Sequence, residues 1–337
     1  MHQPEAPARK FGLADASGWY NFGMTLLFTD PLFLHHETGP HPERSDRLRA
    51  VTVRLAKSGV AGLCAHGDYQ PMSEDEVKGL HAAVQMQFAK QVCEEGGGYL
   101  DGDTVVCPES FTVALAAAGA CASAVDAVIG GQARNALCLV RPPGHHATPT
   151  TSMGFCLFNN IALAAQRARK KHGLSRILIV DWDVHHGNGT QDVFYADGGV
   201  QFYSIHRYGH GFYPGTGAAD ETGTGPGLGR ILNMPIRYGT PRPEYRSAFT
   251  SALEKAADAI KPELVLLSAG FDAHAADPIG SLGLEVEDFA EMTKAILDVA
   301  RTHAGGRLVS CLEGGYDLEA LAASVQAHLE ELLGAAT

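Results

Sequence analysis

ILIVDWDVHHGNGTQ, residues 177–191, is the stretch of sequence that decides the fold. It begins as an unbroken apolar run and ends in acidic residues, histidines and glycines. An unbroken run of this kind is typical of a strand in a parallel sheet, because both faces of such a strand are covered by other elements. Parallel strands need long crossover connections, which are usually helices. The stretch therefore predicts an α/β fold.

Similar runs recur on both sides of this stretch and alternate with helical patterns. The strand-like runs are 26–29, 136–140, 176–181, 200–205, 263–269 and 307–312, and the helical patterns are about 78–95, 111–129, 159–171, 244–260, 287–303 and 317–333. The alternation predicts one α/β domain, residues 24–337, with a mainly parallel central sheet flanked by helices. Met24 directly precedes the first run, so we expect residues 1–23 to be an N-terminal extension or a misassigned start.

Composition limits the classes of partner. Lys and Arg number 26 against 38 Asp and Glu, a net charge of −12. We therefore expect no direct nucleic-acid partner, although a cationic substrate is compatible with this charge.

The seven cysteines form no C-x-x-C pair, which favours reduced thiols and a cytoplasmic location. We found no apolar run near the roughly 18–20 residues that span a bilayer, and so expect no membrane partner.

Acidic and imidazole side chains gather where the central strand ends. Because side chains alternate along a strand, Asp181, Asp183 and His185 project to one face, and Trp182 and Val184 to the other. Burying two carboxylates is costly without a compensating charge, and no Lys or Arg lies in this segment. Carboxylate oxygen and imidazole nitrogen are standard zinc ligands, so the segment predicts a metal site.

A third protein ligand is expected from another strand end. The best candidate is Asp272 in LVLLSAGFDAH, and His274, two residues further on, is its competitor. Three protein ligands with one open position are typical of a catalytic zinc site.

Two further segments supply groups for hydrolysis. RPPGHH places His145 and His146 after a strand, and neighbouring imidazoles with different partners can divide the tasks of base and acid. SCLEGGYD places the Tyr316 hydroxyl at the same sheet edge, where a phenol can donate to a developing oxyanion.

Several motifs together resemble the histone deacetylase superfamily, most closely its class II branch and the bacterial histone deacetylase-like amidohydrolases. They run in the family's order from about residue 26 to 333 and are HHETGPHPERSDRL, RPPGHH, MGFCLFNN, DWDVHHGNGTQ, FYPGTG, SAGFDAH and LEGGYD. The resemblance implies an arginase-like α/β fold with zinc at the base of a narrow tunnel.

The resemblance also implies roles at the metal. Asp183, His185 and Asp272 would bind zinc, although iron(II) is possible because ligand type alone discriminates weakly between these metals. His145 and His146 would activate the water, with His146 the better candidate for general base and acid. Tyr316 would polarise the acyl oxygen together with zinc.

Further positions follow from the same likeness. Asp181 would hold His145 and Asn188 would hold His146, and asparagine at 188 fits class II. Gly154 would allow close approach of substrate. Phe155 would form one tunnel wall, and Tyr213 or its neighbour Phe212 the other.

The family also binds a structural potassium ion. Here its ligands would be backbone carbonyls of Asp181, Asp183, His185 and Ile205, with side-chain help from Asp181 and Ser204.

We therefore expect a zinc-dependent amidohydrolase that removes acetyl or other acyl groups from the ε-amino group of lysine in proteins or peptides. The alternative is a deacetylase of acetylated polyamines or other small amides. In polyamine-selective relatives a glutamate follows the third ligand, and Ile279 occupies that position here, which disfavours the alternative. An inactive acyl-lysine binder would need a broken ligand set. The oligomeric state stays open.

Overall fold

The fold is built on one eight-stranded sheet in which every paired strand is parallel. The computed structural model describes residues 24–336, so the expected extension at 1–23 lies outside the described residues. Across the sheet the order is β2 (Ala65–His66), β1 (Thr25–Phe28), β5 (Asn135–Cys138), β10 (Leu308–Leu312), β9 (Leu264–Ala269), β6 (Ile177–Asp181), β7 (Val200–Arg207) and β8 (Ile231–Ile236). The predicted α/β class and mainly parallel sheet are confirmed.

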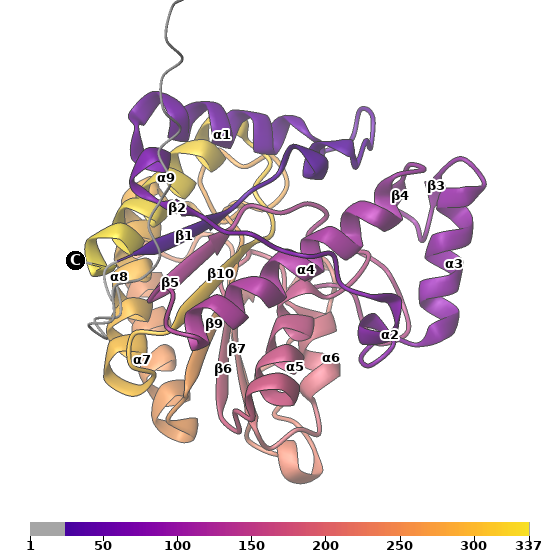
Figure 1. Ribbon diagram of the computed structural model, residues 1–337. Coiled ribbons are helices and arrows are strands. Elements are labelled where there is room, and N and C mark those ends of the chain that lie inside the picture. Colours follow the sequence, from indigo (N-terminus) through magenta and orange to yellow (C-terminus); the bar gives the residue numbers. More distant parts are fainter. Residues whose placement is uncertain (1–23, 337) are drawn as a thin grey trace, which may run out of the picture.

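Helices cover both faces of this sheet (Figure 1). One layer holds α7 (Arg242–Ile260), α8 (Val286–His303) and α9 (Leu318–Ala336), with α1 (Asp46–Ser58) packed on α9. The opposite layer holds α4 (Ser110–Ile129), α5 (Asn160–His172) and α6 (Asn188–Phe194). Beyond α4 lie α2 (Glu74–Val77), α3 (Ala83–Glu94) and a hairpin of β3 (Gly98–Tyr99) and β4 (Val105–Val106).

Some element boundaries differ from the prediction. The helix expected at 78–95 begins only at Ala83, because the buried His81 side chain contacts the Thr148 carbonyl and accepts from the Asn159 amide, which fixes a turn there. Helices α1, α2 and α6 and strands β2, β3, β4 and β8 were not predicted from the sequence. Strand β8 is interrupted by the polar Asn233 and by Pro235, a residue confined to edge strands, and β8 is an edge strand.

The expectation that no apolar run could span a bilayer was wrong for α4. This helix has 20 residues, and its most apolar 18-residue window has a mean hydropathy of 1.8, enough by length and composition to cross a membrane. However, 72% of its most apolar window is buried inside the protein, against β5, β10 and α5. A core helix passes the same test, so this one helix is weak evidence for a membrane span.

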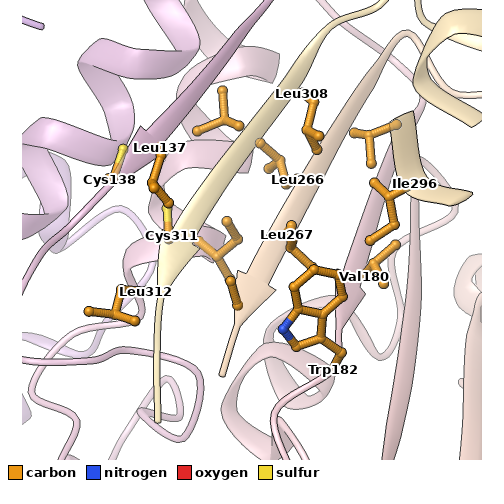
Figure 2. Close-up of a cluster of buried hydrophobic side chains, with 14 of the residues drawn as sticks. Leu137, Cys138, Val180, Trp182, Leu266, Leu267, Ile296, Leu308, Cys311 and Leu312 are labelled. Carbon is orange, nitrogen blue, oxygen red and sulfur yellow. The ribbon is translucent and has the colours of Figure 1, made fainter. Parts of the chain in front are cut away.

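Trp182 anchors the layer of α7, α8 and α9 to the sheet. Its indole is fully buried, and its ring centroid lies 6.2–6.3 Å from those of Phe249, Phe271 and Phe289. Figure 2 shows the indole beside Leu267, Val180 and Ile296. Trp182 enters the apolar core while its neighbours Asp181 and Asp183 contact histidines, as predicted. However, β6 ends at Asp181 and residues 183–185 form a bend, so the extended strand expected through His185 stops earlier.

A buried ionic network joins α1 to the chain that follows β10. Glu43, Arg47 and Arg141 are all 0% exposed. Glu43 accepts from Arg47 Nη1 at 3.1 Å and from Arg141 Nη2 at 2.7 Å. Arg47 Nε donates to the Gly315 carbonyl at 2.6 Å, directly before Tyr316. The network therefore fixes the backbone that carries Tyr316.

We predict that Leu266→Ala lowers the free energy of unfolding by about 2–5 kcal/mol, because Leu266 is fully buried in a central strand and truncation leaves a cavity. Chemical denaturation followed by circular dichroism measures this loss. Leu228→Ala serves as the control, since Leu228 is 69% exposed and its truncation should change stability little. Equal losses in the two variants would contradict this picture of the core.

Glu43→Gln is expected to cost about 3–5 kcal/mol, because it leaves two buried guanidinium groups without the carboxylate they contact. Burial alone raises the pKa of Glu43, but the Arg141 charge and hydrogen bonds from His36 and Arg141 outweigh it and hold that pKa well below its usual value. The stabilisation is therefore complete above the unfolded pKa of about 4.3 and is lost as the pH falls below it.

The free energy of unfolding, measured from pH 7 down to pH 3, should fall more steeply for the wild-type protein than for this variant. The exposed pair of Glu37 and Arg49 gives the control Glu37→Gln, which should behave like the wild type. Identical pH dependence in Glu43→Gln and the wild type would rule out the network as an acid-sensitive contact.

Candidate metal centre and active site

Two carboxylates and an imidazole converge where β6 and β9 end. A ligand atom from each of Asp183, His185 and Asp272 lies within 4.8 Å of the other two, and all three residues are buried. His185 Nδ1 lies 3.1 Å from Asp183 Oδ1 and 3.1 Å from Asp272 Oδ2. His274, the competing candidate, points elsewhere: its Nε2 lies 3.6 Å from Glu285. The structure thus brings together the predicted trio.

Glycines make room for these carboxylates. A Cβ on Gly270 would lie 2.1 Å from Asp183 Oδ2, and a Cβ on Gly314 would lie 2.3 Å from Asp272 Oδ2. The Gly314 amide also donates to Asp183 Oδ2 at 2.8 Å, and the Val184 amide to Asp272 Oδ1 at 2.8 Å. Any side chain at either glycine would displace a carboxylate, so these backbones form a close-fitting cradle around the cluster.

The buried carboxylates of Asp183 and Asp272 carry negative charge that needs a proton or a cation beside it. Burial, followed by the nearby charge of Asp183, raises the pKa of Asp272 to about 7. The pKa of His185 rises to about 9, because its hydrogen bonds to Asp183 and Asp272 outweigh the effect of burial. The protein alone therefore balances this charge only by retaining protons. A divalent metal ion would balance it directly, and two carboxylates with one imidazole can hold such an ion.

The two adjacent histidines have opposite electrostatic environments. Their ring centroids are 4.0 Å apart. His145 Nδ1 lies 2.9 Å from Asp181 Oδ2, and the charges of Asp181 and Asp183 outweigh burial and raise the pKa of His145 well above its usual value. His146 Nδ1 lies 2.7 Å from Asn188 Oδ1, and burial, with the charges of His145 and His185, holds its pKa well below the usual value. These surroundings favour the protonated form of His145 and the neutral form of His146.

Tyr316 stands opposite Phe155, with ring centroids 5.9 Å apart and planes at 88°. Its amide donates to Asp277 Oδ2 at 2.7 Å, and the Arg47 guanidinium lies 5.1 Å from its ring centroid. Burial, with the charge of Asp272, raises the pKa of Tyr316 well above its usual value. Its hydroxyl therefore keeps its proton and can act as a donor.

Aromatic rings flank the histidines, as expected for a tunnel. Phe212 stacks on His185 at 5.0 Å with an angle of 6° between the rings. Tyr213 contacts both His146 at 5.1 Å and His185 at 6.2 Å, so both candidates for this wall approach the site. Gly154 has a φ of +57°, and a Cβ there would lie 2.4 Å from the His146 ring. That contact, rather than substrate alone, excludes a side chain at 154.

The remaining predicted positions lie around this centre. Ser204 pairs with Asp181 across β6 and β7, as the potassium prediction needs, although its hydroxyl also contacts His206 Nδ1 at 2.9 Å. Ile205 follows it and is fully buried. Ile279 is half-buried in the loop after Asp272, and its amide donates to Asp277. The potassium site stays a prediction.

Sequence reasoning missed Glu313. This residue is 1% exposed, and its Oε2 accepts from the Gly144 and His145 amides at 2.7 and 3.2 Å. Burial raises its pKa to about 7. It therefore fixes the turn that carries both histidines. Its place directly after a buried strand, the same signal that identified Asp181, could have revealed it.

Comparisons with known proteins agree with this geometry. The histone deacetylase domain model matches residues 41–332. The histone deacetylase-like amidohydrolase of Pseudomonas aeruginosa is 37% identical over 331 residues, covering 92% of this chain and 86% of that protein. The human polyamine deacetylase HDAC10 is 42% identical over 302 residues, covering 87% of this chain and 44% of that protein.

A solved structure, the crystal structure of the HDA15 HD domain, superposes with a TM-score of 0.87 at 38% identity, covering 93% of this chain and 89% of that one. The chain spans about half the length of some curated relatives, such as 56% of Histone deacetylase 15 of Arabidopsis thaliana. The named relatives are deacetylases and amidohydrolases, which are hydrolases. By its domain match, its close relatives and its fold, this chain belongs to the histone deacetylase family.

Proposed function

We propose that this protein is a zinc-dependent amidohydrolase that removes acetyl or other acyl groups from the ε-amino group of lysine. One observation carries the proposal: two adjacent imidazoles, one against Asp181 and the other against Asn188, lie with Tyr316 around a buried Asp-His-Asp cluster. This set contains a ligand group, a base, an acid and an oxyanion donor, which amide hydrolysis by water requires.

The residues divide the reaction as follows. Asp183, His185 and Asp272 would hold a zinc ion, which when bound would supply a Lewis acid for water and the acyl carbonyl. His146, with its lowered pKa, accepts a proton as water attacks the carbonyl carbon, and then delivers a proton to the amine as the C–N bond breaks. The products are a carboxylic acid and a free amine. Tyr316 donates its hydroxyl proton in a hydrogen bond to the acyl oxygen, and Asp181 keeps His145 charged beside the site.

The acetylpolyamine alternative is kept, because one relative, 42% identical, is named a polyamine deacetylase. Ile279 argues against it, since the side chain at this position offers no charge to a distal ammonium group. Lysine peptides are therefore the first substrate class to test.

The decisive experiment is amide hydrolysis by zinc-loaded protein on parallel panels of acetyl-lysine peptides and acetylpolyamines. We expect turnover of peptides that chelation abolishes and added zinc restores. Asp183→Ala should bind less than one equivalent of zinc, measured by elemental analysis after dialysis, because it removes one ligand. Turnover confined to polyamines would favour the alternative, and full activity in the chelated sample would overturn the metal requirement.

We predict that His146→Ala and Tyr316→Phe each lower kcat by a factor of about 10² to 10⁴ while retaining zinc, since each removes a group needed after substrate binds. Steady-state kinetics and metal content are measured on the same preparations. Tyr99→Phe offers a matched control, because Tyr99 is 65% exposed and lies outside the site. Wild-type kcat in either active-site variant would remove that residue from the mechanism.

A further inference from the structure

A hollow of about 750 Å³ opens where β7 and β8 end. Residues 207–210 and 235–238 line it, and none of them is acidic. Parallel strands end at the same edge of a sheet, so the hollow shares its edge with the Asp-His-Asp cluster.

Arg207 joins the hollow to the tunnel wall. Its guanidinium lies between two rings, 4.4 Å from the Phe212 centroid and 4.6 Å from the Tyr238 centroid. Its Nη1 donates to the Gly280 carbonyl at 2.7 Å, next to Ile279. Phe212 stacks on His185 from its other side. Only one ring therefore separates this guanidinium from a metal ligand.

The cations of this hollow have no acidic partners. Among residues 24–336, Arg207 and Arg237 form no ion pair, whereas the nearby Arg242 and Arg246 both pair with Asp288. The chain has an excess of acidic residues, with a net charge of −12, so a hollow lined by two arginines and no carboxylate stands out. Arg237 is also exposed, and so its guanidinium is available to a ligand.

We propose that this hollow binds a carboxylate of the substrate, so that the preferred substrate is an acyl-lysine peptide with a carboxylate close to the modified lysine. This inference rests on the proposed function and names its substrate class. Guanidinium groups suit the task because their planar donors match both oxygens of a carboxylate. Arg207 is already held by two rings and a carbonyl, so it loses little freedom when a ligand binds.

A peptide substrate is long enough to place a carboxylate in the hollow while its acetyl-lysine occupies the metal centre. A lysine side chain holds the peptide backbone outside the metal centre, and neighbouring residues follow at about 3.3–3.6 Å each. An acidic residue near the lysine, or a free C-terminal carboxylate, can then reach a hollow one ring away from His185. Polyamines carry distal cations instead, which Arg207 and Arg237 repel.

The test uses peptides that differ in one group. Acetyl-lysine peptides with an amidated C-terminus carry glutamate, glutamine or lysine next to the acetyl-lysine, on its N-terminal or its C-terminal side. A further peptide has no acidic side chain and ends in a free carboxylate. Steady-state kinetics give kcat and KM, and fluorescence anisotropy gives Kd on the wild-type protein. We expect at least one carboxylate peptide to show a KM and a Kd about three- to tenfold lower than its neutral counterpart, with kcat unchanged.

Arg237→Gln should abolish this preference, and added salt should weaken it. Arg230→Gln is the control, because Arg230 precedes β8 at its opposite end, donates to the Ala259 carbonyl and should keep the preference. Equal KM and Kd for all peptides, or an unchanged preference in Arg237→Gln, would overturn the inference. Failure of the proposed function looks different, because no peptide would then be hydrolysed while the Kd values still report on the hollow.

Discussion

Buried negative charge at the carboxyl ends of β6 and β9 is the constraint on which the rest of the structure depends. Asp181, Asp183 and Asp272 are all 0% exposed, and a carboxylate in such surroundings is stable only with a proton, a cation or several hydrogen bonds. Each of the three receives a backbone amide hydrogen bond or a histidine contact. The remaining charge is what a metal ion would balance.

The surrounding fold is shaped to this constraint. Gly270 and Gly314 let two neighbouring strand ends approach the carboxylates more closely than any other residue could. Glu313 holds the turn of the two histidines, and Arg47 holds the carbonyl before Tyr316. The catalytic groups are therefore positioned by buried polar contacts rather than by loops alone, as a precise hydrolytic site requires.

The sequence predicted the central strands of the sheet better than the edge strand β8. ILIVD and LVLLSA are unbroken apolar runs, so β6 and β9 were found almost to the residue, and period-two alternation separated Trp182 from its acidic neighbours. Strand β8 was missed because Asn233 and Pro235 interrupt its apolar pattern. Contacts between distant segments, such as Glu43 with Arg141, were not predictable, because no local pattern records which buried ions meet.

The site itself followed from residue types at strand ends, with Asp272 preferred over His274, and the fold supplies the geometric reason for that preference. Neither is distinguished by spacing alone, and only the geometry turns His274 toward Glu285. The arginines of the hollow were also not predictable as a pair, since Arg207 and Arg237 come from different strand ends.

The most direct test of the central claim is a zinc-edge anomalous difference map from crystals of the zinc-loaded protein. A second cluster, the buried thiols of Cys121, Cys138 and Cys311, provides an internal competitor, with Cys138 and Cys311 on the paired strands β5 and β10 (Figure 2). We predict a strong peak about 2.0–2.2 Å from ligand atoms of Asp183, His185 and Asp272. A map with no peak there, or with zinc only at the cysteines, would contradict it.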